Sequence, residues 1–211
     1  MYGLAAVAVL IVLSFMAHST PYFPIDLAIS QAVQKLQSPA LDAAALVIDW
    51  PGYVPQVAII LVLAGVGLFA IGYRWEAVVF WLANLREAAV DGLIKIVVRR
   101  PRPEEGLGVH IYKPHGDFTY PSGHIFSYIM LFGLLAYFCW VLMKPSALRT
   151  ILVVLLIALV VVAGPVRIYL GEHWPSDVFA GLLLGSLCLP LMVSIYHWGQ
   201  GRFFKKKAPQ A

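Results

Sequence analysis

Charged side chains are scarce in this sequence. Of its 211 residues, 12% are Asp, Glu, Lys or Arg, whereas an average soluble domain carries about a quarter. Apolar residues reach 61%, and the mean hydropathy is +0.82. This composition excludes a disordered chain, because disorder needs low hydrophobicity and high charge, and it argues against a water-soluble globule.

Cysteine and metal-ligand clusters are also rare. The two cysteines, Cys139 and Cys188, lie inside apolar runs, which predicts packing residues and not a disulfide or a metal site. No cluster of Asp, Glu and His residues has the spacing that metal ligands show. The sequence also contains no internal repeat. We therefore expect a single domain over 1–211 with no cofactor. The net charge of +4 is too dispersed for a nucleic-acid partner, apart from a short basic tail at about 199–211.

Long apolar runs are what the sequence does contain. A spanning helix needs about 20 mostly apolar residues, and five segments meet or nearly meet that length: 2–17, 54–73, 123–143, 150–170 and 177–198. A sixth, 76–98, is interrupted by charges, which in a span usually face the bundle interior: Arg86, Glu87, Asp91 and Lys95. The first segment lacks a basic n-region and is expected to be a retained helix, not a signal peptide. The sequence predicts an all-α membrane protein with a six-transmembrane-helix bundle.

Charge distribution predicts the orientation, because cytoplasmic loops carry an excess of Lys and Arg. One set of loops and the tail holds a single acid, Glu76, against many basic residues: Arg74, Lys144, Arg149, Arg202, Lys205, Lys206 and Lys207. The other set is acidic apart from a basic cluster at 99–102. We expect a cell-membrane protein with both termini cytoplasmic and with loops 18–52, 99–122 and 171–176 outside.

Loop 18–52 contains an amphipathic pattern. Apolar residues recur there at helical spacing opposite polar ones: Ile25, Ile29, Val33 and Leu36 against Asp26, Ser30, Gln34 and Gln37. This predicts an extra amphipathic helix between the first two spans, lying in the outer membrane interface. It would serve either as a packing cover over the bundle or as a guide for lipid.

Polar residues gather at three places on the predicted outer side. Lys95 ends the third span, and the prolines around Arg102 favour stiff, extended backbone near the helix mouth; alone, such a cluster is typical of a headgroup anchor. In the second group, Ser122 suits the N-cap of the fourth span, where Gly123 permits close approach and His124 lies beside an anion-binding helix end. Simple capping would account for the serine but not for the histidine.

The third group joins the last two spans. Pro165 should kink the fifth span and bring Arg167 inward. Pro175 favours the first turn of the last helix, so Asp177 is expected to accept a hydrogen bond from one imidazole nitrogen of His173 and leave the other free to act as a nucleophile. Together the three groups collect helix N-termini, cations and imidazoles at one membrane boundary, which suits a dianionic phosphate.

These residues resemble a known family. The pattern is similar to the three-part signature of type-2 phosphatidic acid phosphatases (PAP2), integral-membrane lipid phosphate phosphatases: Lys95-x6-Arg102-Pro103, Pro121-Ser122-Gly123-His124 and Arg167-x5-His173-x3-Asp177. The signature covers 95–177, and the helix layout extends the likeness to nearly the whole chain. The family's third motif usually begins Ser-Arg, whereas Val166 stands here, which puts one hydroxyl hydrogen bond in doubt.

The resemblance implies a role for each matching residue. His173 would be the nucleophile that forms a phosphohistidine, Asp177 would orient it, and His124 would protonate the leaving oxygen and then activate water. Five residues would bind the phosphoryl oxygens without a metal ion: Lys95, Arg102, Ser122, Gly123 and Arg167. Three further residues near the mouth are expected to be solvated, with headgroup contact as the alternative: Asp117, His110 and His115.

The expected function is hydrolysis of a lipid phosphate or pyrophosphate that enters sideways from the bilayer. The resemblance implies undecaprenyl pyrophosphate, phosphatidylglycerophosphate or phosphatidic acid as substrate, and an outward-facing site favours the first. One alternative is a lipid phosphotransferase that uses the same site. Another is a transporter or lipid-phosphate binder without turnover, against which the complete set of nucleophile, acid and orienting residue argues. No obligate protein partner is indicated.

Overall fold

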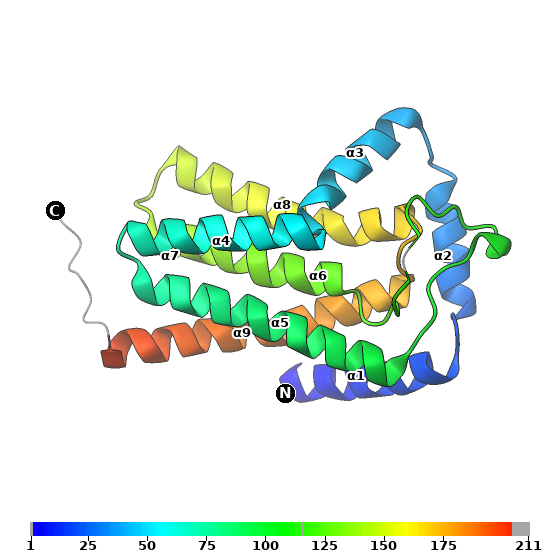
Figure 1. Ribbon diagram of the computed structural model, residues 1–211, viewed down its shortest axis with the longest axis horizontal. Coiled ribbons are helices and arrows are strands. Elements are labelled where there is room, and N and C mark those ends of the chain that lie inside the picture. Colours follow the sequence, from blue (N-terminus) through cyan, green and yellow to red (C-terminus); the bar gives the residue numbers. More distant parts are fainter. Residues whose placement is uncertain (1, 115, 204–211) are drawn as a thin grey trace.

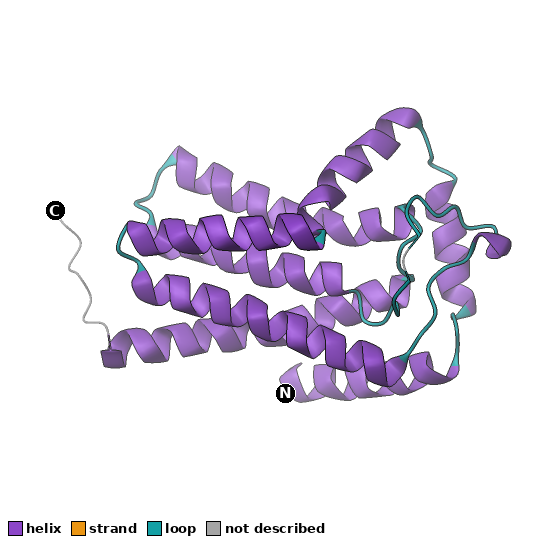
Figure 2. Ribbon diagram, in the orientation of Figure 1, coloured by secondary structure: helices purple, strands orange, loops and turns teal. Residues whose placement is uncertain are grey.

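The computed structural model describes residues 2–114 and 116–203. Within these residues all regular secondary structure is helical, and loops join the helices (Figure 2). The long and short helices follow one another along the chain: α1 (Tyr2–Ser19), α2 (Pro24–Gln34), α3 (Pro39–Asp49), α4 (Val54–Ala70), α5 (Arg74–Val98), α6 (Gly123–Tyr128), α7 (Leu134–Leu142), α8 (Ala147–Tyr169) and α9 (Pro175–Phe203). A π-helical turn, η3 (Ile129–Gly133), joins α6 to α7, and single turns lie before α4 (η1, Trp50–Gly52) and in the long loop (η2, Glu105–Leu107).

Each apolar segment of the sequence forms a helix close to its predicted ends. By length and composition, three helices among the described residues qualify as membrane spans: Gly123–Leu142, Ala147–Tyr169 and Pro175–Arg202. Two bent pairs raise the number to five if each pair is one span, α1 with α2 at 88° and α3 with α4 at 58°. The protein is therefore a multi-pass helical membrane protein, and the number of six spans stays a prediction.

The longer helices run side by side along the long axis (Figure 1). The α6–α7 segment is the central one: 56% of its window is buried inside the protein, against 17% for α8. Its aromatic and aliphatic side chains pack against α5 and α9 in the main core, which includes Phe80, Phe126, Met130 and Phe138. The outward-facing apolar side chains of α8 are exposed in the structure, as expected for a helix that meets lipid.

The connections gather at two opposite ends of the bundle. The α1–α2–α3 segment, the long α5–α6 loop and the α8–α9 turn meet at one end, on the right in Figure 1. The α4–α5 and α7–α8 turns and the end of α9 lie at the other. The three loops that we predicted on one side of the membrane are thus together, and they carry all three polar groups.

Helix α2 covers the segment with the amphipathic pattern, but its polar face turns inward; its predicted role as an extra helix in the membrane interface stays a prediction. Its polar residues point into the protein, where Asp26, Ser30 and Gln34 are buried, while Ile25 and Leu36 are exposed. The polar face is buried because it has partners there: the Gln34 side chain donates to the carbonyls of His110 and Tyr169. Helix α3 was not predicted, and it brings Asp49, at its C-terminal end, into the site described below.

Candidate active site

The turn between α8 and α9 carries the third motif. Arg167 lies in the last turn of α8, two residues after Pro165, which this helix accommodates without ending. His173 follows in the turn, just before α9 begins at Pro175, and is 1% exposed. The short turn thus places a buried guanidinium and a buried imidazole in one compact segment.

His173 does not contact Asp177 in the expected way. The distance from Nδ1 of His173 to Oδ2 of Asp177 is 3.8 Å, too long for a hydrogen bond. The hydroxyl of Thr119 lies between them, 3.0 Å from Nδ1 and 2.7 Å from Oδ2. Spacing along α9 brought the carboxylate to the correct side of the ring, but a residue from the α5–α6 loop makes the contact.

The environment of His173 favours its neutral form. Burial is the main cause that holds the pKa of this imidazole well below its ordinary value, and four nearby positive groups act in the same direction: Arg102, Arg167, Lys95 and His124. A neutral imidazole keeps a lone pair for attack. Since all four groups come from the three motifs, the structure brings these motifs together around His173.

The second motif begins α6. Ser122 is the N-cap residue, yet its hydroxyl makes no capping bond and has no hydrogen-bond partner among the described residues, although it is buried. Capping therefore does not explain this serine. At Gly123 a Cβ atom would lie 2.6 Å from Oδ2 of Asp91, so a larger residue would force this helix start away from α5.

His124 is held by groups from α3, η1 and α6. Its Nε2 lies 3.5 Å from Oδ1 of Asp49, and its ring contacts Tyr53 edge-on and stacks on Tyr128. Glycine is required at Gly52, where a Cβ atom would lie 2.2 Å from the His124 ring. The α3–α4 connection therefore fixes this imidazole beside a carboxylate.

Arg167 is held between two buried carboxylates. Its Nη1 lies 3.0 Å from both oxygens of Asp49 and 2.5 Å from Oε2 of Glu172. Asp49 consequently contacts both a predicted phosphate ligand and the predicted acid–base histidine. Nothing in the sequence motifs assigns a role to Asp49 or Glu172, which the structure places in contact with Arg167.

The first motif is paired with acids as well. Asp117 binds Nζ of Lys95 at 3.0 Å and Nη2 of Arg102 at 2.7 Å, and Arg102 also donates to the Glu172 carbonyl at 2.6 Å. Asp117 is thus more than a solvated loop residue, although its side chain remains 52% exposed. Despite opposing burial, the two cations hold the pKa of this carboxyl below its ordinary value.

Two histidines of the same loop were also predicted near the mouth. The His110 ring contacts Tyr112, and its backbone bonds Gln34 of α2, so this residue helps to anchor the loop. His115 lies outside the described residues.

Arg100 is the part of the basic cluster that the sequence left unexplained. It is fully buried and binds Oδ1 of Asp177 at 2.5 Å and Oδ2 of Asp26 at 2.8 Å. Its guanidinium also donates to Ser176 and lies over the Phe23 ring. This arginine of the basic cluster therefore ties α2 and the loop to α9.

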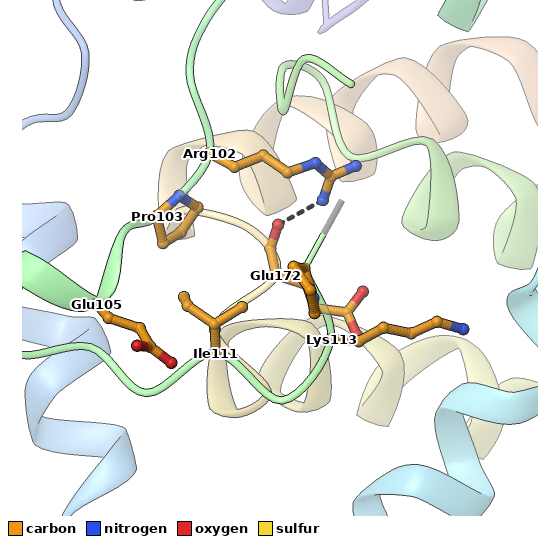
Figure 3. Close-up of a pocket in the computed structure, with 8 residues that line it drawn as sticks. Arg102, Pro103, Glu105, Ile111, Lys113 and Glu172 are labelled. Atoms are coloured by element: carbon orange, nitrogen blue, oxygen red, sulfur yellow. Dashed lines mark hydrogen bonds between the residues drawn. The ribbon is translucent and has the colours of Figure 1, made fainter. Parts of the chain in front are cut away.

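A cavity of about 340 Å³ adjoins the site. Figure 3 shows Arg102 at its edge, bonded to the Glu172 carbonyl, with Lys113 and Glu105 on the surrounding loop. Ile111, Pro103 and Pro114 add apolar walls. The cavity has room for a polar group of moderate size next to a predicted phosphate ligand.

A model of the PAP2 superfamily matches residues 76–200, which include all three motifs. The chain belongs to the PAP2 superfamily. The family that the motifs resemble is therefore confirmed.

Two curated proteins resemble the chain, one over most of its length and one over less than half of it. Phosphatidylglycerophosphatase B of Bacillus subtilis (strain 168) is 27% identical over 179 residues, 84% of this chain and 86% of that protein. An Escherichia coli (strain K12) protein provisionally assigned as an undecaprenyl-diphosphatase is 33% identical over 93 residues, 42% of this chain and 41% of its own length.

Two solved structures share the fold. The crystal structure of a transmembrane PAP2-type phosphatidylglycerolphosphate phosphatase from B. subtilis has a TM-score of 0.83 at 23% identity and covers 96% of this chain and 100% of its own. That of Aquifex aeolicus LpxE has a TM-score of 0.65 at 23% identity, covering 82% and 96%. The arrangement of helices described above is thus a PAP2 arrangement.

The sequence located the motif residues but not the groups that hold them. Thr119, Asp49, Arg100, Asp26 and Glu172 were not assigned to the site. Glu172 had a usable signal, since it precedes His173 inside the third motif. Asp26 and Asp49 lie far from every motif in the sequence, and nothing in the pattern distinguishes them from other loop acids.

Proposed function

We propose that the protein is a membrane lipid phosphate phosphatase that hydrolyses a lipid phosphomonoester or pyrophosphate through a phosphohistidine on His173. The observation that carries this proposal is a buried imidazole whose pKa is lowered by burial and by the cationic side chains of Arg102, Arg167 and Lys95, which favours its neutral form. Such a group is poised to attack phosphorus, and the cations stabilise the charge on the transferred phosphoryl group. Membership of the PAP2 superfamily supports the same chemistry.

The reaction divides between the two histidines. Nε2 of His173 forms a bond to phosphorus while the bond to the leaving oxygen breaks, and His124 donates a proton to that oxygen. In the second half, His124 accepts a proton from water, water attacks phosphorus, and the P–N electron pair returns to His173. Asp49, 3.5 Å from His124, stabilises the protonated form of this imidazole before each donation.

Phosphate binding is assigned to the remaining motif residues. Lys95, Arg102 and Arg167 supply charge, the Ser122 hydroxyl supplies a donor, and Gly123 lies at the start of α6, where backbone N–H groups suit an anion. The half-exposed Asp117 gives up its two cations to the incoming phosphate, whereas the buried Asp49 and Glu172 stay with Arg167. No metal ion is required, because these cations neutralise the developing charge.

The substrate class follows from the surroundings and from the relatives. The site lies at one end of a helical bundle with a lipid-facing surface, so a phosphate can enter while its apolar tail stays in the bilayer. Phosphatidylglycerophosphate and undecaprenyl pyrophosphate are the first candidate substrates, since the matched relatives are named as phosphatases of these lipids. Phosphatidic acid is the third candidate. The cavity beside Arg102 has room for the polar part of the lipid.

We further propose six spans with both termini in the cytoplasm and the site outside. Basic residues lie at the end of the bundle opposite the site, among them Arg74, Lys144 and Arg149, in line with the positive-inside rule. Helix α5 would complete the six, with its charged residues turned toward the interior. Helices α2 and α3 would lie between the first two spans at the outer interface.

The nucleophile is tested by replacing it. We expect His173→Gln in purified, detergent-solubilised protein to reduce phosphate release from each of the three lipids by several orders of magnitude, because a covalent nucleophile is lost. His197→Gln, at the other end of α9, is the matched control and should retain activity. Release above about a hundredth of wild type in the His173 variant would contradict the mechanism.

A lipid phosphotransferase would use the same residues. Both reactions pass through the phosphohistidine and differ only in the acceptor. Adding a lipid or sugar alcohol and analysing the products distinguishes them: hydrolysis yields free phosphate, and transfer yields a new phosphate ester. Phosphate binding without turnover in wild-type protein, unaffected by His173→Gln, would point to a binder or transporter.

The orientation is tested by labelling. After replacement of Cys139 and Cys188, single cysteines are introduced at Lys113 and at Lys144, both exposed and at opposite ends. A membrane-impermeant reagent applied to intact cells should label position 113 and spare position 144. The reverse pattern would invert the topology.

A further inference from the structure

The Thr119 hydroxyl links the two parts of the predicted His–Asp pair. It lies 3.0 Å from Nδ1 of His173 and 2.7 Å from Oδ2 of Asp177, while the two residues themselves are 3.8 Å apart. All three are buried, with at most 1% exposure. Contact between the imidazole and the carboxylate therefore passes through a third side chain.

Counting donors decides the direction of these bonds. Asp177 is surrounded by donors: Oδ1 accepts from Arg100 at 2.5 Å, and Oδ2 accepts from the Trp174 N–H at 2.9 Å and from Thr119. A carboxylate next to a guanidinium only accepts, so the single hydrogen of the Thr119 hydroxyl points to Asp177. The same oxygen must then accept from His173, which places the ring proton on Nδ1.

We propose that Thr119 is a positioning residue for the phosphatase reaction, a relay that transmits the charge of Asp177 to His173. With the proton on Nδ1, the lone pair of His173 resides on Nε2, which is the nitrogen that attacks. As the N–P bond forms and the leaving oxygen takes its proton from His124, the ring becomes positively charged. The Nδ1–H of that ring stays bonded to Thr119, whose hydroxyl stays bonded to the carboxylate.

The position of Thr119 is set by the same segment that holds Asp177. Its backbone N–H donates to the carbonyl of Arg100 at 3.0 Å, and the Arg100 side chain binds Asp177 from the other side. The loop segment that precedes α6 and the loop segment that follows α5 therefore both hold Asp177. Threonine and carboxylate are held at a fixed separation, as a relay needs.

Three variants of one residue test the relay. Thr119→Ser keeps the hydroxyl and should retain at least about a third of wild-type kcat. Thr119→Val is nearly the same size without a hydroxyl, and Thr119→Ala leaves space if valine impairs folding. Both should lose about 10- to 100-fold in kcat with little change in KM, because a hydrogen bond to a ring that becomes charged is lost.

The pH profile separates a relay from a purely structural role. Without the Thr119 hydroxyl, the protonated ring of His173 is no longer connected to the Asp177 carboxylate by hydrogen bonds. The pKa of His173 should then fall, and the acid limb of kcat/KM should move to lower pH. Thr119→Ser should restore the limb. The other charged groups that act on this ring are the same in every variant: Arg102, Arg167, Lys95 and His124.

The outcomes separate this inference from the proposed function on which it rests. Wild-type kcat and an unmoved acid limb in both hydroxyl-free variants would overturn the relay while leaving the phosphatase intact. A lower kcat accompanied by a raised KM and an unmoved limb would also overturn it, since that result marks misplacement alone. Full activity of His173→Gln would instead overturn the proposed function.

Discussion

Replacement of Asp117 by asparagine should strengthen the binding of inorganic phosphate. In the structure its two oxygens bind Lys95 at 3.0 Å and Arg102 at 2.7 Å, which are two of the proposed phosphate ligands. The carboxylate is half-exposed on a loop, so phosphate must compete with it for these cations. Asparagine keeps the shape and removes the competing charge.

The size of the effect follows from the exposure of these pairs. A solvent-accessible ion pair contributes up to about 1 kcal/mol, so two pairs together amount to about 1–2 kcal/mol. Since about 1.4 kcal/mol corresponds to a factor of ten, the inhibition constant of inorganic phosphate should fall about 5- to 30-fold. The gain should shrink as salt is raised, because exposed charges are screened.

The assay is competitive inhibition of lipid hydrolysis by inorganic phosphate at two ionic strengths. Glu104→Gln is the matched control: it removes one negative charge from an exposed position of the same loop and should leave the constant within about twofold of wild type. An unchanged constant in Asp117→Asn would refute the competition. A higher one would show that Asp117 serves to position the two cations.

Further predictions concern pH, stability, packing and metal. The proposed mechanism needs His173 as a neutral ring, and the pKa of this ring is depressed, so the acid-side loss of kcat/KM should begin below the ordinary imidazole pKa of 6.5. The profile is corrected for the substrate's own titration, and half-loss at or above that pH would contradict this. Arg100→Met leaves Asp26 and Asp177 buried without their guanidinium and should destabilise the protein by about 3–5 kcal/mol in detergent unfolding, whereas exposed Arg99→Met should change little. Gly52→Ala should displace the His124 ring and lower kcat/KM about 100-fold; Gly67→Ala, with open space around it, should not. Treatment with EDTA should leave activity within about twofold, and strong inhibition would argue for a metal.

The helices and the three motifs could be predicted because their signals are local. An apolar stretch of span length must satisfy its backbone hydrogen bonds within itself in a bilayer, so it forms a helix wherever it packs. The ends of α8 and α9 were predicted to within a few residues for this reason. The motif spacing likewise placed Arg167 at the end of one helix and His173 just before the next, without any knowledge of neighbouring helices.

Charged residues in the loops were harder to interpret. The sequence assigns neither Asp26 nor Asp49 to the site and places Asp26 on the polar side of an amphipathic helix, yet both are buried and bind Arg100 and Arg167. Their positions depend on α2 and α3, whose orientation over the end of the bundle is decided by long-range contacts. The helical pattern predicted α2, but it did not predict that its polar face would turn inward.

The sequence by itself determined the class of protein, its helices and the side chains that carry the chemistry, since hydropathy and motif spacing act over short stretches of chain. Only the tertiary structure decided which group stands next to each of them. Thr119 lies 54 residues from His173 in the chain, and Asp49 lies 118 from Arg167. Such pairs meet through helix packing and loop closure, and a shift of one ångström separates a hydrogen bond from the 3.8 Å between His173 and Asp177.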